Sequence, residues 1–401
     1  MKLASGHLTY CSNIYPGERW VDHFAALKES FPSIRQELSP DGPMGIGLRL
    51  SNLASLDLME EKALNDFLEW LSENQAYVFT MNGFPYGGFH HTRVKDQVHA
   101  PDWTSKERVD YTLRLFHILA ELIPDGMDGG VSTSPLSYKP WFETKESMAA
   151  AKDQATENIL IVAEQLYTIW ERSGIVLHLD IEPEPDGLLE SGREFIDWFE
   201  NDLLPKGVAS FGKKLNLSDS DAEVLIRQHI CLCYDVCHFA IGYEPHAAII
   251  KELADKNIQV GKIQISAAIK AGLSRTYDER TAVINAFSKF NEDTYLHQVI
   301  AKRNNGELIH YADLPEAIAD CNNPDVNEWR AHFHVPIFKE DFGLLKSTQS
   351  DIVMVLDLFN EKLFTNHLEV ETYTWDVLPD TLKVPLNQSI TRELKWVKAI
   401  L

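Results

Sequence analysis

Four polar residues stand at matching places in short apolar runs, and together they have the chemistry of a cation site. Glu182 and Asp235 each end such a run, Glu371 lies within another, and Gln264 takes a similar place in a fourth. Polar and apolar residues alternate along each run, so the polar side chains share one face. A buried carboxylate without a partner is very costly, so a metal ion, another cation or a substrate is expected beside them. The alternative interpretation is a buried interior that is satisfied by hydrogen bonds or internal ion pairs.

A histidine follows Asp235 at a spacing that brings the two side chains together. His238 lies three residues after Asp235, one short turn beyond the end of the apolar run. At the end of a strand, this Asp-x-x-His spacing lets both side chains face one pocket. Cys231 and Cys233 precede the pocket end on the same run and are not turn-held pairs. We therefore interpret them as buried apolar residues rather than zinc ligands.

A second histidine-rich segment shows the same alternation. Arg330, His332 and His334 share one face of a polar, strand-like segment at 330–338. We interpret all three as candidate substrate contacts, with His334 also a candidate metal ligand. The alternative is a pair of hydrogen-bonded histidines beside a strand-like loop.

Three further residues are candidate substrate contacts because of their place near strand ends. Arg49 lies near the end of the second apolar run and Asn82 ends the third, while His90 lies in the loop 83–103 that follows. Arg49 has a second interpretation, as the ion-pair partner of an inward carboxylate. Loop histidines such as His90 are often simply solvated.

Eight strand-like runs position these residues. They are His7–Asn13, Gly45–Ser51, Ala76–Asn82, Gly130–Pro135, Ile175–Glu182, His229–Asp235, Val260–Ser266 and His367–Thr374. The stretches between them space their apolar residues as amphipathic helices do, for example Val109, Leu113 and Phe116. Repeated strand–helix alternation predicts a parallel sheet with helices outside. Eight repeats favour a closed (β/α)₈ TIM barrel over an open doubly wound sheet.

We expect one enlarged barrel domain over residues 1–401. Two regions exceed what a minimal barrel needs, namely 83–103 and 270–329. The first is long enough to form a lid or a wall of the site. The second has a mostly helical pattern. The end of the chain, about 382–401, is typical of a helix docked on the body.

Composition excludes several classes of function. The 401 residues include 60 acidic and 37 basic ones, giving a net charge of −23 that repels a phosphate backbone, so no nucleic-acid partner is expected. An odd count of five cysteines does not fit a secreted disulfide framework. No apolar run approaches the roughly 18 residues of a membrane span, and the N-terminal residues lack an apolar signal core. We expect a cytoplasmic protein with a small-molecule substrate, and the oligomeric state stays open.

The order of these residues resembles the xylose-isomerase-like TIM-barrel superfamily of sugar isomerases, sugar epimerases and endonuclease-IV-type enzymes. Several motifs of the whole chain are similar to one branch, the EboE family of metabolite-traffic proteins. They are Gly6-His7-Leu8-Thr9-Tyr10-Cys11-Ser12-Asn13, Asn82-Gly83-Phe84-Pro85-Tyr86-Gly87, Pro135-Leu136-Ser137-Tyr138-Lys139, His332-Phe333-His334-Val335-Pro336 and Val370-Glu371-Thr372-Tyr373-Thr374-Trp375. The resemblance implies a role in metabolite biosynthesis or traffic, and the reaction of the family is not settled.

The resemblance also implies roles for single residues. Glu182, Asp235 and Glu371 occupy the positions of the metal-binding carboxylates, and His238 matches the motif histidine that contacts substrate or a second metal. Gln264 stands where sugar epimerases usually have histidine, which weakens the expected metal affinity unless His334 fills the place. The third and fourth strands offer no histidine for the zinc cluster of the endonuclease branch. A three-metal phosphodiester site is therefore not expected.

Three carboxylates and an amide oxygen are hard donors, which suit one Mn²⁺ or Mg²⁺ ion, or Zn²⁺ if a histidine joins them. Such an ion polarises the carbonyl of a hydroxycarbonyl substrate and stabilises an enediolate, while Glu182 and Glu371 pass protons as base and acid. The first hypothesis is therefore a metal-dependent isomerase or epimerase of a polyol-like or sugar-phosphate-like metabolite.

Two other classes of function stay open. A metal-dependent hydrolase or lyase would use a bound water, and His332 and His334 in a second metal position would favour it. A non-catalytic carrier of a hydrophobic metabolite would use the aromatic residues of the loop after Asn82. Fold alone does not decide among the three.

Overall fold

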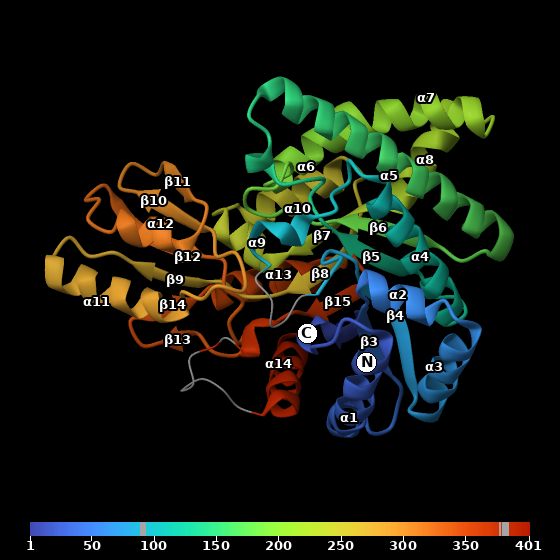
Figure 1. Ribbon diagram of the computed structural model, residues 1–401, viewed down its shortest axis with the longest axis horizontal. Helices are drawn as coiled ribbons and strands as arrows, with labels where there is room; N and C mark the ends of the chain where they lie inside the picture. The colour runs from blue at the N-terminus through green and yellow to red at the C-terminus, as the bar shows by residue number, and fades with distance from the viewer. Residues whose placement is uncertain (89–93, 377, 379–384) are drawn as a thin grey trace.

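The computed structural model describes residues 1–88, 94–376, 378 and 385–401, and its larger sheet forms a barrel (Figure 1). Neighbouring strands follow the order β1-β2-β15-β8-β7-β6-β5-β4-β3. Their bounds are β1 Lys2–Leu3, β2 Gly6–Tyr10, β3 Met44–Arg49, β4 Ala76–Asn82, β5 Gly129–Thr133, β6 Leu177–Ile181, β7 Ile230–Asp235, β8 Val260–Ile265 and β15 His367–Val370. Among the described strands of this sheet, only β1 pairs antiparallel. A parallel bridge between Cys11, which follows β2, and Gly47 of β3 joins the two edges of the parallel strands. The predicted eight-stranded barrel is confirmed.

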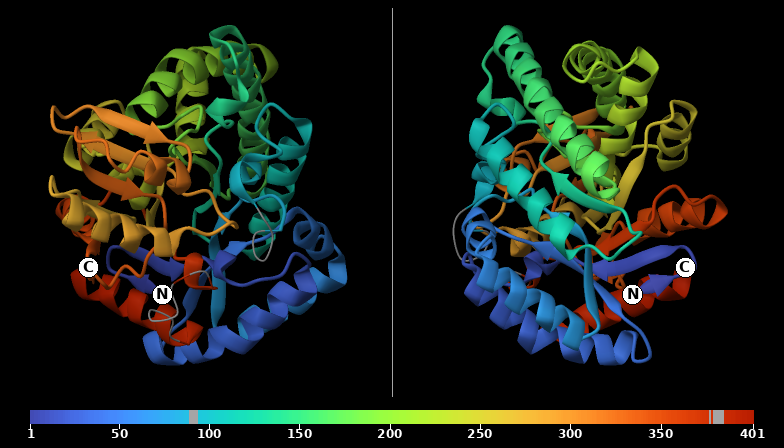
Figure 2. Two further views of the ribbon diagram at one scale, coloured as in Figure 1. Left: turned by 60° about the vertical axis from the view of Figure 1, so that its left-hand side comes forward. Right: turned by 90° about the vertical axis from the view of Figure 1, so that its right-hand side faces the viewer.

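Helices pack around the outside of this sheet (Figures 1 and 2). Their bounds are α1 Trp20–Leu38, α2 Asn52–Leu58, α3 Glu61–Glu73, α4 Lys106–Leu122, α5 Lys145–Ser173, α6 Gly192–Trp198, α7 Leu204–Lys214, α8 Asp219–His229, α9 Val236–Ile241, α10 His246–Asp255 and α13 Gln349–Glu361. The longest, α5, begins with a capping box between Thr144 and Ser147 and ends at Gly174, whose φ of 73° suits a residue without a side chain. Local sequence thus sets the length of a helix that packs against β6.

The segment 270–329 forms two α-helices and most of four strands of an antiparallel sheet, so the prediction that it is mostly helical is wrong. The sheet has the order β11-β10-β12-β9-β14-β13 and stands beside the barrel (Figure 2, left). The bounds are β9 Ile269–Gly272, β10 Val299–Arg303, β11 Leu308–Tyr311, β12 Val326–Ala331, β13 Asp341–Phe342, β14 Leu345–Ser347, α11 Tyr277–Phe287 and α12 Leu314–Ala319. Short apolar runs such as 299–301 do not distinguish a buried strand from a piece of helix, which explains the error.

The polar segment 330–338 is a strand only at its start. Strand β12 ends at Ala331, and the Phe333 backbone N–H then donates to the carbonyl of Ala331 in a tight turn. The turn breaks the expected alternation, so Arg330 no longer shares a face with His332.

The chain ends in helix α14, Leu386–Ile400, which lies against α1 and buries Ile390, Leu394 and Val397. Residues 382–384 of the predicted terminal helix lie outside the described residues. Within the described part of the chain, no helix has the length and apolar composition to cross a membrane. That residues 1–401 make a single domain stays a prediction.

The middle of the barrel is filled by polar side chains that glycines make room for. Lys262 and Glu369 form an ion pair with both side chains fully buried. A methyl group on Gly47 would come within 1.8 Å of Glu369 Oε1, and one on Gly261 within 1.8 Å of Asp180 Oδ1. A side chain at either position would have to displace a buried carboxylate, so glycine makes room for the polar side chains in the middle of the barrel.

Candidate functional site

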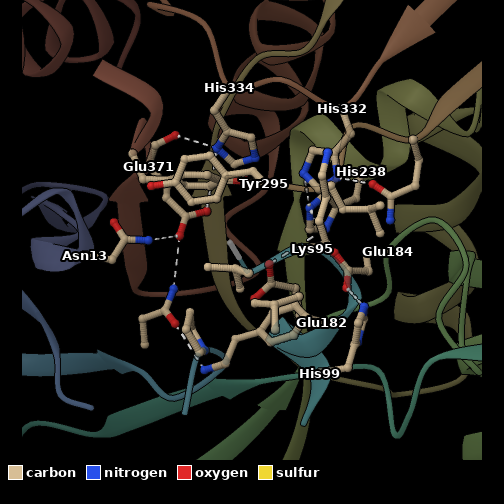
Figure 3. Close-up of a pocket in the computed structure, with 18 residues that line it drawn as sticks. Asn13, Lys95, His99, Glu182, Glu184, His238, Tyr295, His332, His334 and Glu371 are labelled. Atoms are coloured by element: carbon tan, nitrogen blue, oxygen red, sulfur yellow. Dashed lines mark hydrogen bonds and ion pairs between the residues drawn. The ribbon is translucent and has the colours of Figure 1, made fainter. Parts of the chain in front are cut away.

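A pocket opens at the carboxyl ends of the barrel strands (Figure 3). Its cavity volume is about 60 Å³, several times the space that one water molecule needs. The polar residues that line it include Asn13, Asn82, Lys95, His99, Glu182, Glu184, His238, Gln298, His332, His334 and Glu371. This is the end of the barrel where the sequence placed the candidate site.

Glu182 and Glu371 face the same cavity and share one hydrogen-bond donor. Gln264 Nε2 donates to Glu182 Oε1 over 3.3 Å and also to Glu371 Oε2. Glu371 Oε1 accepts further hydrogen bonds from Asn13 Nδ2 at 2.6 Å and Asn82 Nδ2 at 3.0 Å. Three amides thus hold the Glu371 carboxylate from three strand ends. In this arrangement Gln264 acts as a bridging donor, with its oxygen near the Cys233 thiol at 3.4 Å.

Asp235 lies behind the pocket and is fixed by its neighbours. Its Oδ1 accepts from Ser266 Oγ at 2.6 Å and from the backbone N–H of His238 at 3.2 Å. The second of these contacts caps α9, so the strand-to-helix turn itself orients the carboxylate. Its other oxygen, Oδ2, lies 3.9 Å from His238 Nε2.

Three histidines also line the pocket. His238 Nε2 lies 3.2 Å from His332 Nε2, and His238 Nδ1 lies 3.0 Å from the carbonyl of Pro183. His332 Nδ1 contacts Gln298 Oε1 at 2.9 Å, and His334 Nδ1 contacts the Glu371 carbonyl at 3.1 Å. The structure thus brings the Asp-x-x-His histidine together with both histidines of the later segment, from separate parts of the chain.

Glu184 and His99 make one further pair at the edge of the pocket. His99 Nε2 lies 3.0 Å from Glu184 Oε1, and both side chains are buried. His238 Nε2 lies 3.9 Å from Glu184 Oε2. Figure 3 shows this pair across the cavity from Glu371 and Asn13. Glu184, which the sequence left open as a supporting or solvated residue, lines the pocket.

Burial and like charge set the electrostatics of the site. Burial, with the charges of Asp235 and Glu369, raises the pKa of Glu371 to about 8. Burial and the neighbouring Glu371 and Asp235 raise the pKa of Glu182 well above its ordinary value. Burial also lowers the pKa of His334 to about 4. The metal-free pocket therefore keeps protons on carboxyl groups and leaves His334 neutral, the form of histidine that binds metals.

The donors that are present fit one divalent metal ion. Among the described residues, Glu182 Oε2, Asp235 Oδ2 and His334 Nε2 are buried atoms without a hydrogen-bond partner. Ligand atoms of Asp235, His238 and His334 all lie within 4.8 Å of one another. Carboxylate oxygens with one or two imidazole nitrogens suit Mn²⁺, Zn²⁺ or Co²⁺. Asp235, His238 and His334 would hold the ion, with Glu182 and Glu371 beside them.

The structure does not bring every candidate residue into the pocket. Asn82 lies in it, whereas the Arg49 guanidinium donates to the carbonyls of Pro85 and Gly87 and so holds the loop behind the wall. Arg330 donates to the Ala240 carbonyl at 2.6 Å. Its guanidinium also contacts Glu328 and Tyr243, away from the pocket. His90 lies outside the described residues.

Several pocket residues had no signal in the sequence. His99 and Gln298 come from the two long insertions, where no periodicity marks a face, and they meet Glu184 and His332 from more than 30 residues away. Asn13 is different, because it ends the first predicted strand just as Asn82 ends the third. The same strand-end criterion would have selected Asn13.

No family model and no curated protein matches this chain. Among solved structures, a xylose isomerase-like TIM barrel protein from Mycobacterium smegmatis in complex with magnesium is similar at 11% identity and a TM-score of 0.48, covering 98% of this chain and 100% of that one. The IolI protein with a zinc atom is similar at 13% identity and a TM-score of 0.47, covering 98% and 97%. A probable 3-DHS dehydratase, AsbF, from Bacillus anthracis has 9% identity and a TM-score of 0.45, covering 97% of each chain. The barrel assignment rests on the strand order of this chain.

Proposed function

We propose that the pocket at the carboxyl ends of the barrel binds one divalent metal ion and that the protein is an isomerase or epimerase of a small polyol-like or hydroxycarbonyl metabolite. The observation that supports this most strongly is the set of buried carboxylates Glu182, Asp235 and Glu371. Within the part of the chain that the structure describes, Glu182 and Asp235 each keep one oxygen without a hydrogen-bond partner. A bound Mn²⁺, Mg²⁺ or Zn²⁺ ion would supply Lewis acidity, polarising the substrate carbonyl and stabilising charge that develops on its oxygen.

Glu182 and Glu371 are the proton-transfer pair of this proposal. Both face the cavity, and Gln264 holds them through one amide group. In its ionised form, one of them takes a proton from the carbon next to the substrate carbonyl. For an epimerase, the other, in its protonated form, returns a proton to the opposite face of the same carbon. For an isomerase, it returns a proton to the former carbonyl carbon, while the proton of the adjacent hydroxyl moves to the former carbonyl oxygen. In the metal-free pocket, a pKa of about 8 leaves both forms of the Glu371 carboxyl accessible at neutral pH.

The remaining polar residues orient the pair and the substrate. Asn13 and Asn82 fix the Glu371 carboxylate by donating to one of its oxygens. His238 and His332 are within reach of substrate hydroxyl groups because both rings line the cavity. Such positioning is a large part of the rate that an enzyme gains from binding.

Exchange of substrate hydrogen with solvent tests the proposal without knowledge of the natural substrate. The protein, loaded with Mn²⁺, is incubated in D₂O with a panel of ketoses, aldoses and their phosphates. We expect deuterium at the carbon next to the carbonyl of one compound, measured by NMR, and its loss in the Glu371→Gln variant. Absence of exchange across the panel, together with unchanged Mn²⁺ affinity in Glu182→Gln, would overturn the proposal. Binding of a metabolite that survives loss of both glutamates would instead support the carrier hypothesis.

A hydrolase or lyase is the second candidate, because of one specific observation. Ligand atoms of Glu184, His238 and His332 lie within 4.8 Å of one another and form a second donor set beside the first. A second ion there would activate a water molecule. Two ions located in this pocket by anomalous scattering favour this candidate, and a single ion favours the isomerase.

Membership of the EboE family, and with it a role in metabolite traffic, is the narrowest part of the proposal. It is supported by the five motifs, of which four contribute pocket residues, namely Asn13, Asn82, Glu371 and the pair His332 and His334. Identification of the metabolite in the exchange experiment decides whether the pathway assignment holds.

A further inference from the structure

A second cluster of metal-type ligands lies at the opposite, amino end of the barrel. Asp128 precedes β5, His178 lies on β6 and His367 begins β15. His367 Nε2 lies 3.6 Å from Asp128 Oδ1, and His178 Nε2 lies 3.8 Å from Asp128 Oδ2. Ligand atoms of all three residues lie within 4.8 Å of one another. None of these residues belongs to the pocket described above.

The distances within this cluster are close to what one ion requires. Ligand atoms bound tetrahedrally to Zn²⁺ at about 2.0–2.2 Å are separated from each other by about 3.3 Å. The separations of 3.6 and 3.8 Å are too long for good hydrogen bonds, yet only a few tenths of an ångström longer than this value. His367 is fully buried, and among the described residues neither of its ring nitrogens has a hydrogen-bond partner.

A buried carboxylate behind the cluster fixes the ring of His178. His178 Nδ1 lies 2.6 Å from Asp180 Oδ1, so Nδ1 carries a proton toward Asp180. His178 Nε2 lies 3.8 Å from Asp128 Oδ2, and either a proton on Nε2 or a metal ion between the two atoms offsets the charge of the carboxylate. A histidine that donates its second nitrogen to a carboxylate is the usual arrangement behind a protein-bound metal ion.

Solvent reaches this end of the barrel. A cavity of about 330 Å³ adjoins the cluster, lined among others by Asp128, His178, Cys231 and Gly261. The Asp128 side chain is 37% exposed, whereas His178 and His367 are buried. An ion can therefore enter from solvent and keep a water molecule on its open side.

We propose that Asp128, His178 and His367 bind a Zn²⁺-like transition-metal ion that cross-links the amino end of the barrel. Two imidazoles and one carboxylate suit Zn²⁺ or Co²⁺ better than Mg²⁺. Strands β6 and β15 are separated by β7 and β8 in the sheet, so the ion joins strands that are not neighbours. We assign the ion a structural role because it would hold these strands together at the amino end of the barrel.

Loss of one Zn²⁺ equivalent in a single-site variant tests the proposal. Metal-free full-length protein is titrated with Zn²⁺, and binding is compared for wild type, Asp128→Asn and Asp125→Asn, an exposed aspartate of the same loop that serves as the matched control. We expect Asp128→Asn to lose one equivalent, with affinity at that site reduced about 100-fold or more. Asp125→Asn should bind as wild type does. Equal stoichiometry and affinity in wild type and Asp128→Asn would overturn the proposal.

Two further measurements keep the result interpretable. Co²⁺ in place of Zn²⁺ reports tetrahedral coordination through its visible absorption. Asp128→Asn and His367→Gln should both lose the part of this absorption that Glu182→Gln retains, while their circular dichroism stays native. A Co²⁺ spectrum unchanged in both variants contradicts the proposal. Glu182→Gln should retain this ion, so failure of the metal site at the carboxyl end and failure of this one give different results.

Discussion

Two layers of the barrel interior bury carboxylates, and they differ in what neutralises the charge. In the middle layer, fully buried Glu369 forms an ion pair with Lys262. In the layer above it, Glu182, Asp235 and Glu371 are equally buried, yet within the described residues only histidines lie at ion-pair distance from them. In the middle layer, the Lys262 ammonium group offsets the charge of Glu369. In the upper layer, the carboxylate charges are neutralised by bound protons or by a cation from solution.

This difference separates a structural role from a functional one. Lys262 offsets the charge of Glu369, and a Cβ at Gly47 would meet the Glu369 carboxylate, so the middle layer is closely packed. The upper layer adjoins a cavity. Among the described residues, Glu182, Asp235 and Glu369 each keep one oxygen without a hydrogen-bond partner, but only Glu369 has a lysine to offset its charge. Buried carboxylates whose charge is left uncompensated are typical of binding sites rather than of cores.

The largest effect is expected when the internal cation is removed. Lys262→Met leaves Glu369 buried without its partner, and breaking one side of a buried pair costs about 3–5 kcal/mol. Urea unfolding should show this loss in the free energy of unfolding, with or without added metal. A loss below about 1 kcal/mol would mean that Glu369 is neutralised in another way.

The second prediction removes charge from the upper layer. Asp235→Asn keeps the oxygen that accepts from Ser266 and replaces the unpartnered one, so the fold should persist and metal-free stability should not fall. Mn²⁺ affinity should drop about 100-fold or more, since even indirect support of a metal ligand contributes 10–100-fold. The matched control is Glu244→Gln, a carboxylate outside the pocket whose loss should leave Mn²⁺ affinity unchanged. An Asp235→Asn protein that is less stable without metal, yet binds Mn²⁺ normally, would show that Asp235 has a structural role and not a metal-binding one.

The third prediction concerns pH. A carboxyl group with a raised pKa, about 8 for Glu371, is protonated below that pH in the metal-free protein, and the ion must displace the proton. Mn²⁺ affinity should therefore rise with pH up to about 8, by as much as about tenfold per unit for each proton displaced. Calorimetry in two buffers of different ionisation enthalpy measures the released protons directly. Binding without proton release, at an affinity independent of pH, would show that the upper carboxylates are already ionised.

The smallest effect is expected at the surface. Lys395 forms an ion pair with Glu37 between α14 and α1, and both side chains are about half exposed. Water screens such a pair, so Lys395→Ala should change the free energy of unfolding by no more than about 1 kcal/mol. Comparison with Lys262→Met shows how much burial increases the contribution of one ion pair to the free energy of unfolding. Equal effects of the two variants would contradict that explanation.

Much of the barrel, and the centre of the site, follows from the sequence. Strand and helix periods repeat clearly enough to place eight strands, and parity along them points Glu182 and Gln264 inward. Strand ends in a barrel converge, so residues such as Asp235 and Glu371 meet although they are far apart in the chain.

The rest depends on contacts that no local pattern records. His99 reaches Glu184 from a loop, and Gln298 orients His332 from the inserted sheet. The periodicity of that insertion was ambiguous because its strands are short and half-exposed. Arg330 does not share a face with His332, because the chain turns after Ala331. Alternation of polar and apolar residues alone does not reveal this turn.

The most direct test of the account is an anomalous-scattering map of crystals grown with Mn²⁺. We predict one peak in the carboxyl-end pocket, among Glu182, Asp235, Glu371 and His334, at about 2.0–2.2 Å from the carboxylate oxygens that bind it. The peak should be absent in Asp235→Asn crystals grown under the same conditions. A wild-type pocket that holds only water at saturating Mn²⁺ would contradict the claim that these carboxylates are a metal site.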